Sequence, residues 1–249
     1  MNSSNALRLG EDDYDKAIFH PVIRGLYGES KLYNYGLWSS SDHYQLESLQ
    51  EAARSLVHLH LSSDDALSNS KYVLDVGCGL GECSYILAMN YPNAKVVGIN
   101  YSEYQTRFAE INFGITNRLS FLRSDASSVN MPSSSIDTIH AIEAAMHFRT
   151  RKDFFLESYR LLVPGGKLIL TDALSSIPSS FVPEENCVSS VEEYNMQLVE
   201  SGYTILNYTN IFDQTVIPFT EMLCKNSLQP YARIILSSVQ SYYHIVAIK

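Results

Sequence analysis

The sequence has little of several kinds of residue, and each shortage excludes a class of protein. Four cysteines are spread over 249 residues without a CxxC pair. This is too sparse for a disulfide framework, so we expect free thiols. The seven histidines do not stand beside these cysteines at the short spacings of a zinc site, and no metal site is predicted.

Basic residues are scarce as well. The chain has 18 lysines and arginines against 27 acidic residues, a net charge of −9, and its basic residues are scattered. Such a chain lacks a positive surface for nucleic acid or anionic lipid, so neither is an expected partner. Residues 1–10 are polar and no apolar run approaches membrane length. We therefore expect a cytoplasmic protein without stable membrane insertion.

The hydrophobic residues, 45% of the chain, alternate between short apolar runs and amphipathic stretches. The runs predict strands at residues 72–76, 95–99, 119–122, 136–142, 167–171, 203–208 and 242–249. Helices are predicted at residues 82–90, 103–113, 152–162, 191–201, 219–226 and 231–239. Alternation of this kind predicts an α/β fold with a doubly wound, mostly parallel sheet of seven strands.

One domain over residues 1–249 accounts for this pattern. Residues 11–62 predict an N-terminal helical cap that covers the carboxyl end of the sheet, and residues 71–249 form the core. Two segments of the core, residues 173–190 and 215–240, are expected to close over a ligand.

A glycine-rich turn follows the first predicted strand. The segment VLDVGCGLG, residues 73–81, has glycine at 77, 79 and 81. Glycine adopts unusual backbone torsions and lets a ligand approach the main chain, and such turns bind ligands in open α/β sheets. A dinucleotide site would need Gly-x-Gly-x-x-Gly, but the last position here is Glu82, which argues against a nicotinamide cofactor.

This turn resembles motif I of the class I S-adenosylmethionine-dependent methyltransferases. Further segments resemble the family in the same order: VGINYSEYQ (97–105), SDA (124–126), IHAIEA (139–144), LLVPGGKLILTD (161–172) and YYHIVAIK (242–249). The similarity is to a small-molecule and natural-product branch related to sterol, cyclopropane-fatty-acid and glycine-sarcosine methyltransferases. It implies S-adenosylmethionine as cofactor, S-adenosylhomocysteine as product, and a last strand inserted antiparallel between strands five and six.

The resemblance also implies a set of cofactor contacts. The expected residues are Tyr35, Trp38, Asp75, Gly77, Cys78, Gly79, Gly81, Asn100, Tyr101, Gln105, Asp125, Ala126 and Glu143. Asn100 departs from the acidic residue with which many members hold the ribose hydroxyls, although an amide also donates and accepts. Asn100 as a turn residue, Asp125 as a helix cap, and Tyr35 and Trp38 as packing residues are the structural alternatives.

His147 is the candidate general base, because histidine alone has an ordinary pKa near neutrality. It follows the fourth predicted strand, and the resemblance implies that Asp172, at the end of the fifth, assists it. A packing role for His147 remains an alternative, as does a role for Glu143 in orienting the acceptor. His20 and His43 are weaker candidates.

We therefore expect methyl transfer to an oxygen or nitrogen of a small, partly apolar or aromatic metabolite in natural-product biosynthesis. Carbon methylation of a sterol-like or prenyl-like alkene is the alternative within the class. A nicotinamide-dependent oxidoreductase and a catalytically silent binding module are the alternatives outside it. The expected partner is a small-molecule acceptor, and a homodimer is compatible with the sequence.

Overall fold

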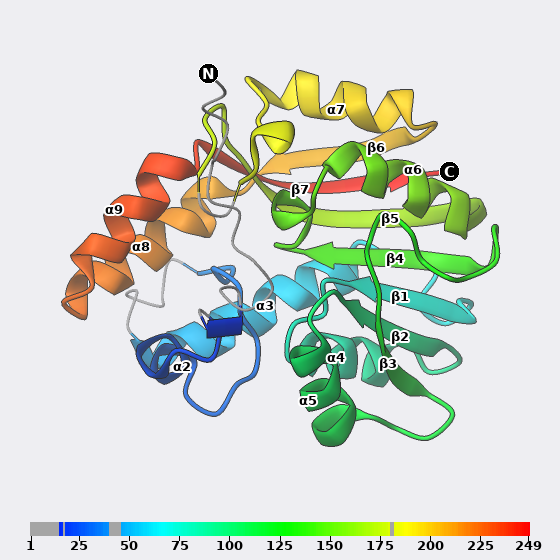
Figure 1. The fold of residues 1–249 in the computed structure, drawn as a ribbon, viewed down its shortest axis with the longest axis horizontal. Helices are drawn as coiled ribbons and strands as arrows, with labels where there is room; N and C mark the ends of the chain where they lie inside the picture. Colours follow the sequence, from blue (N-terminus) through cyan, green and yellow to red (C-terminus); the bar gives the residue numbers. More distant parts are fainter. Residues whose placement is uncertain (1–14, 17, 40–45, 180–181) are drawn as a thin grey trace, which may run out of the picture.

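The computed structural model describes residues 15–16, 18–39, 46–179 and 182–249. This part of the chain builds one seven-stranded sheet in the order β3-β2-β1-β4-β5-β7-β6 (Figure 1). The strands are β1 (Tyr72–Val76), β2 (Lys95–Asn100), β3 (Leu119–Arg123), β4 (Ile136–Ile142), β5 (Leu162–Leu174), β6 (Thr204–Asn210) and β7 (Ser241–Ile248). The predicted fold class, a doubly wound and mostly parallel sheet, is confirmed.

Strands β1 to β5 pair in parallel, and β7 pairs antiparallel with both β5 and β6. The expected insertion of the last strand is therefore present. Strand β5 is longer than the predicted residues 167–171. Both ends are extended by pairing along β7: Gly165 and Gly166 exchange backbone hydrogen bonds with Lys249 at 3.0 Å, and residues 172–174 pair with residues 241–243.

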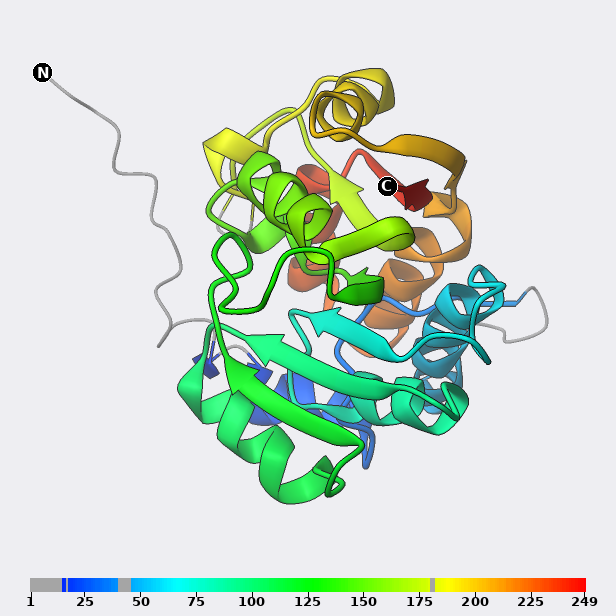
Figure 2. The ribbon, with the colours of Figure 1, turned by 90° about the vertical axis from the view of Figure 1, so that its right-hand side faces the viewer.

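Helices cover both faces of the sheet (Figure 2). On one face lie α3 (Leu49–Ser62), α4 (Glu82–Asn90) and α5 (Glu103–Phe113), which share a core cluster with Val73. On the other lie α6 (Arg151–Leu161) and α7 (Val191–Glu200), packed with Leu74. Because side chains alternate along a strand, neighbouring residues of β1 belong to different cores.

Three further helices, α2 (Pro21–Tyr27), α8 (Val216–Lys225) and α9 (Gln229–Ser238), lie at the end of the sheet toward which β4 points (Figure 1). Short 3-10 turns occur at η1 (Leu46–Ser48), η2 (Ala145–His147), η3 (Glu184–Asn186) and η4 (Phe212–Gln214). The segment expected to cap the sheet thus divides: α2 lies at the carboxyl end, whereas α3 packs along a face. Among the described helices, none is long and apolar enough to cross a membrane.

Three histidines are buried between α3 and the sheet. The His60 ring centroid lies 5.6 Å from that of His140 and 5.5 Å from that of His244. His140 Nε2 lies 2.7 Å from the Tyr91 hydroxyl, which donates to Asp64. Burial lowers the pKa of all three imidazoles, to about 4 for His244. Burial between α3 and the sheet therefore favours the neutral form of these three histidines.

Candidate functional site

The three glycines of the turn at the end of β1 differ in what surrounds them. All three have positive φ: 77° at Gly77, 54° at Gly79 and 95° at Gly81. A Cβ on Gly77 would lie 2.4 Å from the Ala144 Cβ, and one on Gly81 would lie 2.6 Å from the Ala109 Cβ. A Cβ on Gly79 would meet no atom within 4 Å. Gly77 and Gly81 thus permit close packing, and Gly79 faces open space.

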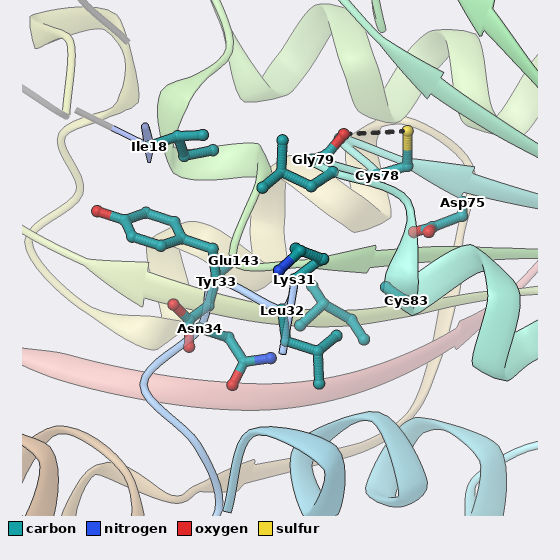
Figure 3. A pocket seen from close by; sticks show the side chains of 13 residues that line it. Ile18, Lys31, Leu32, Tyr33, Asn34, Asp75, Cys78, Gly79, Cys83 and Glu143 are labelled. Atoms are coloured by element: carbon teal, nitrogen blue, oxygen red, sulfur yellow. Dashed lines mark hydrogen bonds between the residues drawn. The ribbon is translucent and has the colours of Figure 1, made fainter. Parts of the chain in front are cut away.

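That turn borders a cavity of about 40 Å³, which has room for a few water molecules but not for a nucleoside. The lining residues are Ile18, Lys31, Leu32, Tyr33, Asn34, Asp75, Gly77, Cys78, Gly79, Leu80, Cys83, Ile142 and Glu143. In Figure 3, Asp75, Cys78 and Cys83 lie on one side, and Tyr33 and Asn34 on the other. Residues 18 and 31–34 of the N-terminal segment form the part of the lining that does not come from the glycine turn, β1, α4, β4 or Glu143.

Asp75 lies at the inner wall of the cavity and is buried. Its Oδ2 accepts a hydrogen bond of 2.6 Å from the Ser84 hydroxyl. Burial raises the pKa of Asp75 to about 6, and the hydrogen bonds from Ser84 and Cys83 oppose that rise. The carboxyl group therefore joins β1 to α4 from a position where charge is costly.

Glu143 is the second buried carboxyl group at the cavity, and its backbone is strained. It directly follows Ile142 at the end of β4 with φ at 50°, although it is not glycine. Its Oε1 accepts hydrogen bonds from the Tyr35 backbone N–H at 2.8 Å and the Tyr242 hydroxyl at 2.7 Å. Burial raises the pKa of Glu143 to about 8, and these hydrogen bonds oppose the rise. Backbone strain and a raised pKa at one buried acid are typical of a functional position.

Polar residues at the carboxyl end of β2 hydrogen-bond to one another and to the glycine turn. Asn100 Nδ2 donates to Gln105 Oε1 at 2.9 Å and, at 3.5 Å, to the carbonyl of Gly79. Its Oδ1 accepts from the Ser102 backbone N–H at 3.1 Å. The structure thus brings Asn100 and Gln105 beside the glycine turn, while Tyr101 is 59% exposed and packs against Arg123.

Asp125 forms a local turn after β3. Its Oδ1 accepts hydrogen bonds from the backbone and side chain of Ser127 at 2.8 and 2.7 Å. The carboxylate is exposed, and the next residue, Ala126, packs against the core shared by α6 and α7. A contact of Asp125 and Ala126 with the cofactor stays a prediction.

Trp38 and Tyr35 belong to the N-terminal segment that lies against Glu143. The Trp38 ring is buried in the core cluster of α3, and its Nε1 donates to the Tyr35 carbonyl at 2.7 Å. Tyr35 packs against Phe219 and Tyr242, with ring centroids 5.1 and 6.0 Å apart. Their packing is observed, and their contact with a cofactor stays a prediction.

His147 ends the η2 turn, close after Glu143 in the chain, and is half-buried. Asp172 supports that turn through its main chain, because its Oδ1 accepts from the Met146 N–H at 3.0 Å. Its Oδ2 accepts from Arg151 Nε at 2.7 Å and the Tyr194 hydroxyl at 3.0 Å. Arg151 and Asp172 thus form a buried ion pair that sequence reasoning missed. His43 lies outside the described residues, and His20 is exposed.

Glu82, which argued against a dinucleotide site, has a role that the sequence did not reveal. It is the first residue of α4, and its Oε2 accepts hydrogen bonds from the Ser30 hydroxyl at 2.9 Å and the Lys31 backbone N–H. Its Oε1 accepts from Arg54 at 3.2 Å. Glu82 therefore fastens the segment that covers the cavity to the helix that begins at the glycine turn.

Comparison with known proteins finds a similar domain and similar relatives. A family model described as a methyltransferase domain matches residues 74–170. The sterol 24-C-methyltransferase of Aspergillus fumigatus is 34% identical over 155 residues, which are 57% of this chain and 40% of that protein. The erythromycin 3''-O-methyltransferase of Saccharopolyspora erythraea is 26% identical over 215 residues, 78% of this chain and 68% of that protein.

The fold is similar over nearly the whole length of a solved structure. A geranyl diphosphate methyltransferase, crystallised with geranyl diphosphate and sinefungin, superposes with a TM-score of 0.78 at 18% identity, covering 96% of this chain and 98% of that one. The chain spans less than half the length of its sterol-methylating relative. The glycine turn thus lies within residues that match a methyltransferase domain, and the fold as a whole is similar to that of a solved methyltransferase.

Proposed function

We propose that the chain transfers the methyl group of S-adenosylmethionine to an oxygen or nitrogen of a small, partly apolar or aromatic metabolite in natural-product biosynthesis. The residues at the cavity fit this cofactor, because Gly79 faces open space and Glu143 presents a buried carboxyl group. Gly77 to Gly79 would hold it with main-chain groups, and Glu143 would face its cationic methionine end. The bound cofactor supplies an electrophilic methyl group on a sulfonium.

The observation that carries the choice of acceptor atom is the position of His147. The η2 turn places an imidazole at the carboxyl end of β4, where doubly wound sheets bind their ligands. Asp172 fixes the turn from the neighbouring strand β5. An alcohol, phenol or ammonium acceptor must lose a proton, and a positioned imidazole can take it.

Aromatic packing supports a partly apolar acceptor. Tyr35, Phe219 and Tyr242 lie in contact beside Glu143 and come from the N-terminal segment, α8 and β7. Small-molecule sites are generally lined by apolar and aromatic groups with a few polar ones that fix orientation. A densely charged acceptor would not suit a site beside these rings.

Carbon methylation of a sterol-like or prenyl-like alkene is the second candidate. The similarity to a sterol 24-C-methyltransferase favours it, but the aligned residues cover 57% of this chain. The alignment with the erythromycin 3''-O-methyltransferase covers 78% and so includes more of the segments outside the matched domain. This difference in coverage supports the oxygen acceptor.

The test begins with binding and then follows the transferred group. S-adenosylhomocysteine, and not NADH, is expected to raise the melting temperature. The protein is then incubated with methyl-deuterated S-adenosylmethionine and a panel of phenols, alcohols, amines and terpenoid alkenes, with products read by mass spectrometry. Stabilisation by NADH alone would contradict the proposal.

With an acceptor found, His147→Ala is compared with His58→Ala, which removes an exposed histidine of α3. We expect the first to lower kcat about 10²- to 10⁴-fold with cofactor affinity unchanged, and the second to leave kcat intact. An unchanged rate in His147→Ala would favour carbon methylation or an already neutral nitrogen. Asp172 is the poorer probe, because its removal would leave the buried charge of Arg151 unpaired.

A further inference from the structure

A carboxylate from the N-terminal segment lies against the end of β2. Asp15 Oδ1 accepts a hydrogen bond of 2.6 Å from Gln105 Nε2, and its Oδ2 accepts one of 2.8 Å from the Ser102 hydroxyl. Gln105 is fully buried, and its other amide atom, Oε1, accepts from Asn100. Asp15 is thus joined through one side chain to the residue that stands where many methyltransferases have an acid.

Asn100 is poorly placed to replace that acid. Its amide nitrogen donates to Gln105 and Gly79, and its oxygen accepts from Ser102. Both ends of the amide therefore serve the loop itself. A neutral amide also binds a pair of hydroxyl groups less strongly than a carboxylate does, since hydrogen bonds to ionised groups are roughly twice as strong.

The segment that carries Asp15 is docked by apolar contacts as well. Phe19 packs on α5, with ring centroids 4.8 Å from Tyr104 and 6.0 Å from Phe108. Ile18 is 1% exposed and lines the cavity together with Gly79 (Figure 3). Asp15 therefore reaches the end of β2 as part of a segment that also covers the glycine turn.

We propose that Asp15 is the ribose ligand of this enzyme: its carboxylate, brought in by the N-terminal segment, accepts hydrogen bonds from the cofactor's ribose hydroxyls beside Asn100. This inference rests on the proposed function for its ligand. A carboxylate has about four lone-pair sites, and Ser102 and Gln105 use one on each oxygen. The remaining sites suit a vicinal diol, and the same contact closes the segment over the bound nucleoside.

The experiment tests whether the effect of removing the ribose hydroxyls depends on Asp15. Affinities for S-adenosylhomocysteine and for its 2′,3′-dideoxyribose analogue are measured by calorimetry in the wild type, Asp15→Ala and Asp15→Asn. In the wild type, loss of the hydroxyls should weaken binding about 10- to 100-fold. In Asp15→Ala that penalty should nearly vanish, because the partner of the hydroxyls is gone, and Asp15→Asn should retain part of it.

Glu103→Gln is the matched control. It removes a negative charge from the same end of α5, but its carboxylate is exposed and pairs with Arg123 at 3.3 Å. This variant should keep the full hydroxyl penalty. Melting temperatures of the cofactor-free proteins show whether each variant is folded, and Asp15→Asn retains an acceptor oxygen if Asp15→Ala is too unstable.

Two results separate this proposal from the function on which it rests. If Asp15→Ala binds S-adenosylhomocysteine but loses the same factor as the wild type on removal of the hydroxyls, Asp15 only docks the segment, and the proposal is wrong. If the wild type does not bind S-adenosylhomocysteine at all, the proposed function itself is contradicted, and the assignment of Asp15 is overturned with it.

Discussion

Replacing Glu143 with glutamine separates the effect of this residue on the unfolding free energy from its effect on cofactor binding. The variant keeps an oxygen in the position that accepts from Tyr35 and Tyr242, and it removes the ionisable group. Because the pKa of Glu143 rises from 4.5 to about 8 in the folded protein, the folded chain holds this proton more tightly than the unfolded chain. The contribution of Glu143 to stability therefore falls as the pH rises through this interval.

The magnitude follows from the size of the interval. Each pH unit between the unfolded and folded pKa values costs about 1.4 kcal/mol of unfolding free energy. From about pH 5 to about pH 7.5 the wild type should lose roughly 3 kcal/mol through this one group. The glutamine variant has no such loss, so its stability relative to the wild type should increase by that amount.

Urea unfolding at several pH values measures the difference. Trp38, the single tryptophan of the sequence, is buried, and its fluorescence reports the transition. Other titrating groups cancel when the two proteins are subtracted. Affinity for S-adenosylmethionine should fall in the variant above about pH 8, where the wild-type carboxyl group is charged and can attract the cationic end of the cofactor. A pH-independent difference in stability would refute the argument that Glu143 is buried at an energetic cost.

Two further predictions concern the turn and the histidines. Gly79→Ala should fold but bind S-adenosylhomocysteine at least tenfold more weakly than the wild type. Gly77→Ala should instead lower the melting temperature, because its Cβ would meet Ala144; equal melting temperatures in the two variants would contradict this distinction. Burial lowers the pKa of His244 from 6.5 to about 4, so its contribution to stability is present above pH 6.5 and is lost as the pH falls, by about 2 kcal/mol near pH 5. In His244→Asn, the decrease in unfolding free energy on acidification, measured by urea unfolding, should be smaller by that amount. An unchanged dependence of the unfolding free energy on pH would show that other groups cause the decrease.

Strand positions and the glycine turn could be predicted because their signals are local. Residues 72–76 form an apolar run that ends at Gly77, and the structure has β1 at Tyr72–Val76. The antiparallel insertion of the last strand between strands five and six came from the resemblance instead. Strand β5 exceeds its prediction because residues on both sides of 167–171 pair with the last residues of the chain, and no local pattern encodes these contacts.

The contacts that cover the site were missed for the same physical reason. Glu82 bonds to Ser30, and Asp15 to Gln105, across separations of 52 and 90 residues. Neither pair leaves a periodic signal. The partnership of Asp172 with Arg151 is likewise invisible in sequence, since a buried arginine in the first turn of a helix reads as an ordinary surface charge. Residues near the glycine turn can be identified from a sequence motif, whereas residues that contact it from distant parts of the chain can be identified only from the structure.

The position of β7 has a consequence for synthesis on the ribosome. Strands β5 and β6 precede β7 in the chain, yet β7 lies between them. A nascent chain that has reached residue 240 possesses β5 with one edge unpaired, and an open strand edge is a template for association with other chains. The sheet can be completed only after residues 241–248 have left the ribosomal tunnel, so the edge of β5 that pairs with β7 is the last edge of the sheet to gain its partner.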